Sequence, residues 1–305
     1  MTSATGELKL RPAIREDAPE IAALLNLISR ELSTTLETAV EVTKWFDLPR
    51  LQTLVAHAPD GTLVGYADLQ SASDENAKFA LDVRGHPTHP TASAPILTEL
   101  ERLATAVAVP GASLRAYVPA SEAALTASLS SAGYQAIRES FTMEIELQDV
   151  PDVELPEGVT LRTFVPGDET AVYETHMESF ADHWGFTPEP YDEWATANLE
   201  RDDFDASLWL LAEADASLTG IVLCRLIDDA RGPIGWVSIL GVRPRWRRRG
   251  LGSALLGSAF SELHARGRNR IGLGVDGQNT TNAVALYERA GMRVVRRMNE
   301  YERVL

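Results

Sequence analysis

An internal repeat constrains the fold of this chain more than any other feature of its sequence. Three pairs of segments share a pattern in the same order: Leu10–Pro12 with Leu161–Thr163, residues 54–67 with 210–223, and Ala132–Arg138 with Ala290–Arg296. The offset rises from 151 to 158 residues, as a duplicated domain with small insertions produces. The chain of 305 residues is therefore predicted to hold two tandem domains.

The predicted boundary is an acidic segment at residues 149–158, which holds two prolines and lacks hydrophobic periodicity. We therefore expect one domain at residues 1–148 and a second at 159–305. In each half, the pattern reads strand, helices, strands, helix, strand, helix, strand, which predicts an α/β or α+β domain with a mixed central sheet flanked by helices. In the second half we expect strands at 160–164, 209–214, 219–227, 236–242, 270–275 and 299–304, and helices at 168–180, 191–199, 252–265 and 281–290.

Charge is distributed unevenly along the chain, whose formal net charge is −16. Residues 236–305 carry 13 Arg and 5 Asp or Glu, a balance of +8, which leaves −24 on the first 235 residues. A globally acidic protein is a poor nucleic-acid binder, whereas a basic C-terminal part indicates either a locally bound anion or solvated arginines. The single cysteine, Cys224, excludes an intrachain disulfide. Without a signal-peptide or membrane-span pattern, we expect a cytoplasmic protein that does not bind a membrane.

The segment from Trp236 to Ser253 carries the strongest chemical signal. A strand is expected to end at Val242, and a turn with Gly250 and Gly252 leads into a helix. The first N–H groups of a helix lack internal partners and lie at the positive end of its dipole, so they can bind a phosphate. The segment lacks the third glycine of a dinucleotide fingerprint and the lysine of a P-loop. A purely structural turn with solvated arginines is the remaining alternative.

This strand, its R-x-x-G-x-G loop and the helix resemble the coenzyme-A-binding motif of the GCN5-related N-acetyltransferase (GNAT) superfamily. The resemblance implies that the strand diverges from its neighbour and that its backbone pairs with the pantetheine arm of acetyl-CoA. Those backbone groups would belong to Leu240, Gly241 and Val242. The pyrophosphate would be held, without a metal, by Arg247, Arg248, Arg249, Gly250, Leu251, Gly252 and Ser253.

A second segment, from Val275 to Met292, resembles the strand, Asn-containing turn and Leu-Tyr helix of the same superfamily. The resemblance implies that Asn279 contacts the coenzyme or caps the helix, and that Asn282 shares this role. It also implies that Tyr287 is the general acid that protonates the leaving thiolate. Ordinary roles as a helix cap and a half-buried core residue are the alternatives. The resemblance covers residues 160–305 well and 8–148 only in outline.

The implied reaction is direct attack of a neutral amine on the thioester, with a backbone N–H near Leu240 stabilising the oxyanion. Family members often place an acidic base on the strand, where this chain has Ser238. The predicted bases are therefore His183 and Glu178, and the ordinary pKa of histidine, about 6.5, favours His183. Packing or capping by His183, or an amine that loses its proton through water, are the alternatives.

The matching loop of the first half, residues 81–96, has lost the R-x-x-G-x-G pattern and contains three prolines, which remove backbone donors. Leu129 occupies the position that the repeat assigns to Tyr287. We therefore expect the first domain to be a degenerate GNAT-like domain that does not bind coenzyme A and shapes the acceptor site or completes the fold. His86 and His89 alone are weak indicators of a metal site.

The sequence as a whole predicts an N-acetyltransferase that transfers the acetyl group of acetyl-CoA to the primary amine of a small molecule. The acidic bulk of the chain favours a cationic acceptor. The tandem layout also resembles that of mycothiol synthases, which are two-domain acetyltransferases with one productive half. A non-catalytic acyl-CoA-binding sensor is the alternative from another class. We expect a monomer or a homodimer with one active site per chain.

Overall fold

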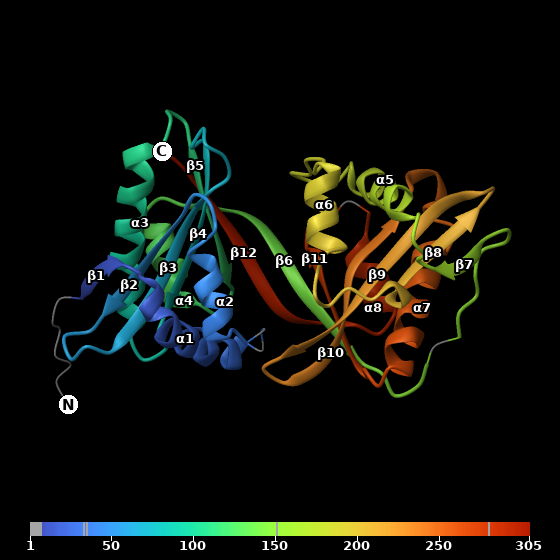
Figure 1. Cartoon of the computed structure of the whole chain (residues 1–305), viewed down its shortest axis with the longest axis horizontal. Helices are drawn as coiled ribbons and strands as arrows, with labels where there is room; N and C mark the ends of the chain where they lie inside the picture. The colour runs from blue at the N-terminus through green and yellow to red at the C-terminus, as the bar shows by residue number, and fades with distance from the viewer. Residues whose placement is uncertain (1–7, 33, 35, 151, 280) are drawn as a thin grey trace. The chain divides into compact units, whose positions relative to one another are not determined.

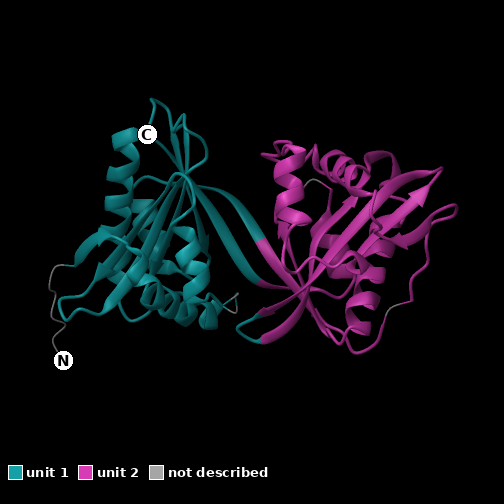
Figure 2. Ribbon diagram, viewed as in Figure 1, with its two compact units in different colours: residues 1–140, 229–231, 296–305 teal, residues 141–228, 232–295 magenta. Residues whose placement is uncertain are grey.

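The computed structural model describes residues 8–32, 34, 36–150, 152–279 and 281–305. These residues form two compact units, which Figure 2 distinguishes by colour. Unit 1 contains the described residues up to Ser140 together with Asp229–Arg231 and Arg296–Leu305, and unit 2 contains Phe141–Asp228 and Gly232–Val295. Both units combine sheet strands with packed helices (Figure 1), which confirms the predicted α/β fold class.

In unit 1, the strands follow the order β1 (Lys9–Pro12), β2 (Leu51–His57), β3 (Leu63–Ser71), β4 (Lys78–Gly85), β5 (Ser113–Pro119) and β12 (Arg293–Val304). Helices α1 (Ala18–Leu32) and α2 (Ala39–Trp45) cover one face, and α3 (Ser93–Val107) and α4 (Ala123–Ser131) cover the other. Successive strand residues point to opposite faces, so Val55 packs with α1 and α2 while Leu54 and Ala56 pack with α3 and α4. The 3-10 helices η1 (Arg15–Asp17) and η2 (Pro90–Ala92) precede α1 and α3.

In unit 2, the strands follow the order β7 (Thr160–Thr163), β8 (Trp209–Ala214), β9 (Ser217–Asp229), β10 (Gly232–Val242), β11 (Arg270–Asp276) and β6 (Gln135–Glu146). Helices α5 (Glu169–Phe180) and α6 (Tyr191–Asn198) pack on one face, and α7 (Leu251–Ala265) and α8 (Ala283–Arg289) on the other. The 3-10 helices are η3 (Ala206–Leu208) and η4 (Pro244–Trp246). These bounds lie close to the predicted ones, except that β12 begins at Arg293 rather than at residue 299. Arg293, Arg296 and Arg297 interrupt the alternation of apolar residues from which a strand is predicted.

Two long strands each contribute to both units. β6 begins in unit 1, and from Phe141 onward it lies in unit 2, where Met143 is fully buried in the core under α7. β12 begins in unit 2, and its residues Met298–Val304 pair antiparallel with β5 in unit 1. The end of the chain therefore completes the sheet that its beginning forms. The predicted domain boundaries, at residues 148 and 159, come from the sequence repeat. The two units are instead defined by which residues contact one another, and they therefore divide β6 and β12.

The repeat in the sequence corresponds to a repeat in strand pairing. The hairpin β2–β3 of unit 1 is antiparallel, as is β8–β9 of unit 2. The next pairs, β4–β5 and β10–β11, are both parallel. Within the part of the chain that the structure describes, no helix combines the length and apolarity that a bilayer crossing needs.

Candidate active site

Strands β10 and β11 diverge before they end. Their parallel register runs from Gly235, opposite Ile271, to Val237, opposite Leu273. β10 nevertheless continues to Val242 and β11 to Asp276. The last residues of β10 therefore present backbone groups that β11 does not pair, and such groups can bind an extended ligand.

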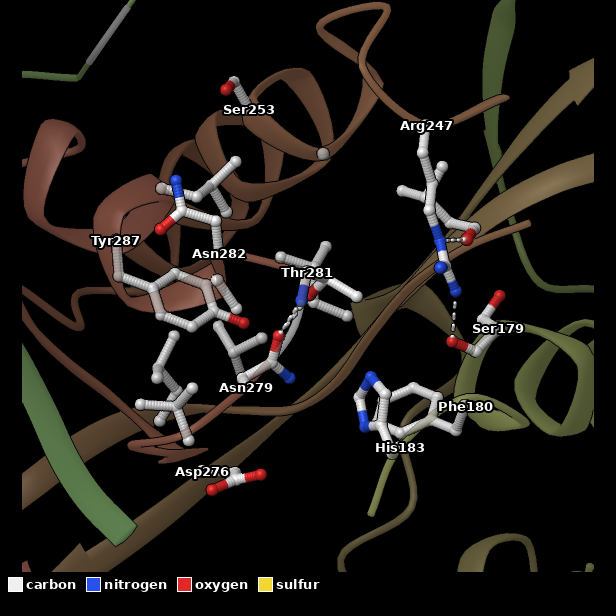
Figure 3. Close-up of a pocket in the computed structure, with 18 of the residues that line it drawn as sticks. Ser179, Phe180, His183, Arg247, Ser253, Asp276, Asn279, Thr281, Asn282 and Tyr287 are labelled. Carbon is white, nitrogen blue, oxygen red and sulfur yellow. Dashed lines mark hydrogen bonds between the residues drawn. The ribbon is translucent and has the colours of Figure 1, made fainter. Parts of the chain in front are cut away.

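A cavity of about 790 Å³ lies in unit 2 where these strands diverge. Figure 3 shows that its wall also includes the start of α7, the helix that carries Tyr287 and the turn after α5. The predicted site residues that line it are His183, Leu240, Val242, Arg247, Arg248, Gly250, Gly252, Ser253, Asn279, Asn282 and Tyr287. The predicted residues outside this lining are Glu178, Gly241, Arg249 and Leu251. Phe180, Thr281 and Arg289 also line the cavity, and the sequence assigned them no role.

The helix start at the edge of the cavity is open to an anion. Gly250 is the N-cap residue of α7 and has φ 85°, a left-handed conformation that glycine adopts without strain. No side chain among the described residues caps the helix, so the first N–H groups are available to a phosphate. A Cβ atom added at Gly252 would meet only Leu286 and Val242, at 3.5 and 3.9 Å. The packing of the protein therefore does not require glycine at position 252, and the absence of a side chain there keeps space open in the cavity.

The three arginines of the loop have different partners. Arg247 forms an ion pair with Asp182 through both terminal nitrogens, and its Nη2 also donates to the carbonyl of Ser179 at 2.9 Å (Figure 3). The guanidinium of Arg249 lies 4.9 Å from the ring centroid of Trp246. Arg248 is exposed and lines the cavity. Arg248 is therefore the best placed to neutralise a phosphate, while Arg247 joins the loop to the end of α5.

The two predicted bases differ in their surroundings. The carboxylate of Glu178 accepts a hydrogen bond from Nη1 of Arg243, whose Nη2 donates to Thr175 at 3.0 Å. Glu178 would have to leave this ion pair to reach an amine in the cavity. His183 lines the cavity, and its ring centroid lies 4.4 Å from that of Phe180. The geometry favours His183, and the identity of the base stays a prediction.

A second, half-buried histidine contacts Phe180 of this wall. Nδ1 of His176 accepts a hydrogen bond from Nε1 of Trp194 at 3.0 Å. Burial, together with the nearby His183, lowers the pKa of His176 to about 4, so this ring is neutral near pH 7. His176 contacts Phe180 edge to face, with centroids 4.9 Å apart. These aromatic contacts therefore support Phe180, whose ring packs against His183.

Tyr287 and the two asparagines come from α8 and the turn before it. Tyr287 is 7% exposed, and burial raises the pKa of its hydroxyl to about 12, so the group holds its proton at neutral pH. Oδ1 of Asn279 accepts a hydrogen bond from the backbone N–H of Thr281 at 2.7 Å, which closes the turn. Asn282 is the N-cap residue, with φ 62°, and its side chain makes no capping bond. The side chain of Asn282 therefore does not cap α8.

Known proteins share both the sequence and the architecture. Residues 170–292 match the model of the acetyltransferase (GNAT) family. A mycothiol acetyltransferase of Salinispora arenicola (strain CNS-205) is 37% identical over 247 residues, which cover 78% of this chain and 77% of that relative. The chain belongs to the GNAT acetyltransferase family. A mycothiol acetyltransferase of Streptomyces coelicolor is 32% identical over 241 residues, which cover 76% of this chain and 73% of that relative.

Two solved GNAT structures resemble the whole chain. A GCN5-related N-acetyltransferase from Sphaerobacter thermophilus superposes with a TM-score of 0.78 and 29% identity, over 97% of this chain and 95% of that one. A tandem GNAT protein from the clavulanic acid biosynthesis pathway superposes with a TM-score of 0.71 over 98% of both chains, at 16% identity, and shows the shared fold. These relationships confirm the predicted tandem GNAT layout and the prediction of an acyltransferase enzyme over a binding module.

The corresponding loop of unit 1 has different chemistry. The hydroxyl of Thr88 lies 2.9 Å from Nδ1 of His86 and 3.0 Å from Nδ1 of His89, so the loop is tied by its own side chains. Pro90 opens η2, where it offers no backbone donor. Among the described residues, no group of three or more His, Cys, Asp or Glu side chains could hold a metal. That unit 1 does not bind coenzyme A stays a prediction.

Proposed function

We propose that the protein transfers the acetyl group of acetyl-CoA to the primary amine of a small molecule, by direct attack in a ternary complex. The observation that carries the proposal is the cavity of unit 2 in which diverging strands, an uncapped helix start and a protonated tyrosine meet. This combination offers an extended backbone edge, an anion site and a proton donor.

Each part of the cavity has its own task in this reaction. The N–H groups that follow Gly250, together with Arg248, hold the pyrophosphate, and the exposed edge of β10 pairs with the pantetheine arm. The amine nitrogen attacks the thioester carbon, the carbon–sulfur bond breaks, the amine loses a proton and the thiolate gains one. A backbone N–H near Leu240 donates to the oxyanion. Tyr287 donates to the sulfur, and His183 or water accepts the proton of the amine.

The buried environment of Tyr287 limits how it acts. A hydroxyl whose pKa is about 12 is a weaker acid than a thiol, whose ordinary pKa is about 8.5. Complete proton transfer to the thiolate is then uphill by roughly 5 kcal/mol, at about 1.4 kcal/mol per pKa unit. Tyr287 therefore contributes mainly a hydrogen bond to the sulfur as the carbon–sulfur bond breaks, and the departing thiolate takes its proton from water.

The test is turnover of acetyl-CoA with a panel of primary amines, followed by release of the free thiol. We expect acetylation of at least one amine and a roughly 100-fold lower kcat for Tyr287→Phe, with little change in the Kd of coenzyme A because the ring is retained. Tyr301→Phe, at a buried tyrosine of unit 1, is the matched control and should behave like the wild type. Tight coenzyme binding without acetyl transfer to any amine would refute the proposal.

The acceptor of the mycothiol acetyltransferases is the second candidate substrate. It is supported by relatives of that name that are 30–37% identical over 76–80% of this chain. Their acceptor belongs in the amine panel. A kcat/KM for it that is far above that of every other amine would assign this chain the same activity.

A further inference from the structure

A second, small pocket adjoins the reaction cavity at Ser238. This pocket, of about 50 Å³, is formed by side chains of β8, β9 and the α6 region, and Ser238 of β10 lines both it and the large cavity. Its polar lining, apart from Ser238, consists of Asn198, Arg201 and Arg225. Trp209, Phe204 and Leu223 supply apolar walls. All of these residues belong to unit 2.

Arg225 brings an unused hydrogen-bond donor to this pocket. Its Nε is buried and has no hydrogen-bond partner among the residues that the structure describes, because the nearest carboxylate oxygen, Oδ2 of Asp203, lies 3.6 Å away. Asp203 is instead engaged by Arg201, whose Nε donates to Oδ1 at 2.7 Å and whose Nη2 donates to Oδ2 at 3.3 Å. Two guanidinium groups thus share one carboxylate, which leaves a net positive charge beside Ser238.

The burial of Arg225 makes this arrangement costly unless an anion binds. The side chain is 25% exposed, and burial lowers the pKa of its guanidinium from the usual value. A buried donor without an acceptor destabilises a protein, and groups of this kind commonly belong to functional sites. Arginine also presents a planar fork that matches a carboxylate through two parallel hydrogen bonds.

The size of the pocket indicates which anion fits. A buried water needs at least about 10–15 Å³ of cavity, so a pocket of about 50 Å³ has room for only a few heavy atoms. A carboxylate, with three heavy atoms, fits this space, whereas a sugar ring is too large for it. An acceptor held here by a carboxylate would extend past Ser238 into the cavity that contains Tyr287.

We propose that Arg225 binds a carboxylate of the acceptor, so that the acceptor class is amines that also carry a carboxylate, such as amino acids and short peptides. The inference rests on the proposed acetyl transfer and names its substrate class. Such an acceptor is zwitterionic, whereas the charge of the whole chain favours a cation. The local positive charge of Arg225 and Arg201 favours an anionic group instead, because it lies directly beside the ligand.

The test compares amino acids with their carboxamides, which keep size and amine but lose the negative charge. For the wild type, kcat/KM should be higher for the acids, and Arg225→Gln should reduce the ratio of acid to carboxamide by roughly 10- to 100-fold. Amidation also changes the pKa of the acceptor amine. The decisive measurement is therefore the change in this ratio between the wild type and Arg225→Gln. Arg293→Gln, which removes an exposed arginine elsewhere in unit 2, is the control and should keep the wild-type ratio.

Binding without turnover provides a second measurement. N-acetyl amino acids and their carboxamides can be titrated calorimetrically into each protein saturated with coenzyme A. A preference for the acids that disappears in Arg225→Gln supports the proposal, and equal affinities, or a preference unchanged by the substitution, overturn it. If amines are acetylated without any preference for a carboxylate, only this inference fails. If no amine is acetylated at all, the proposed function fails, and the titration alone then decides the role of Arg225.

Discussion

Substituting Gly252 by alanine should separate the stability of the protein from its affinity for coenzyme A. The new Cβ would lie 3.5 Å from Leu286 and 3.9 Å from Val242, which are ordinary van der Waals distances. Alanine is favoured over glycine in a helix by about 0.5–1 kcal/mol. For a unit of this size, that gain corresponds to a rise in Tm of roughly 1–4 °C. The fold should therefore tolerate Gly252→Ala or become slightly more stable.

The same methyl group should weaken the binding of coenzyme A. It would occupy space at the cavity edge, where the first N–H groups of α7 are open to a phosphate. The loss of one hydrogen bond to a charged group costs about 1.5–3 kcal/mol, which raises Kd roughly 10- to 100-fold. Acetyl-pantetheine, which lacks the pyrophosphate, should lose little affinity.

Thermal unfolding without ligand and calorimetric titration with coenzyme A give the two readouts. Ser261→Ala is the matched control, because Ser261 also lies on α7 and its hydroxyl bonds only to the carbonyl of Gly257 at 3.0 Å. An unchanged Kd in Gly252→Ala would show that the pyrophosphate does not bind at this turn. A lower Tm would show that the space around Gly252 is not open, and either result refutes the reasoning.

Three further predictions concern the same loop and its support. Arg248→Gln should raise the Kd of coenzyme A more than Arg249→Gln does, because Arg248 lines the cavity and Arg249 does not. The difference measured by titration should shrink at high salt. Gly241→Ala should destabilise the fold by roughly 1–3 kcal/mol in denaturant unfolding, because its Cβ would lie 3.1 Å from that of Ser179; an unchanged midpoint would contradict this packing. Asp182 has a pKa lowered first by its hydrogen bond to arginine, so its stabilisation is present above the usual carboxyl pKa and is lost as pH falls through the lowered value. Asp182→Asn should therefore cost less than about 1 kcal/mol near pH 7, given the half-exposed side chain, and the difference should vanish in strong acid.

The elements around the site were predictable because their signals are local. Pro244 ends the strand, Gly250 permits the left-handed turn, and the apolar positions of α7 recur on one face, where Leu255, Leu256 and Phe260 are now buried. Each of these signals depends only on residues a few positions apart. The strand, the loop and the helix therefore follow from the sequence in the right order and nearly at the right residues.

The sequence does not predict in this way that β6 and β12 each contribute to both units. Nothing local in the sequence indicates which sheet the residues from Phe141 of β6 and from Arg296 of β12 join. Their partners, such as Ser113 opposite Val304, are far away along the chain. Pairing of this kind is decided by which sheet edge is open, and sequence periodicity carries no information about that.

The arginine run shows the same limit at the level of the site. The sequence presents Arg247, Arg248 and Arg249 as equivalent charges, but a guanidinium is available to a ligand only if no carboxylate of the protein already holds it. Asp182, the carboxylate that holds Arg247, precedes it by 65 residues. Because Asp182 directly precedes His183, this ion pair fixes the cavity wall that carries the predicted base to the loop predicted to bind the pyrophosphate. The first arginine of the motif thus supports the wall that carries His183, and we expect the charge that meets the coenzyme to belong to Arg248.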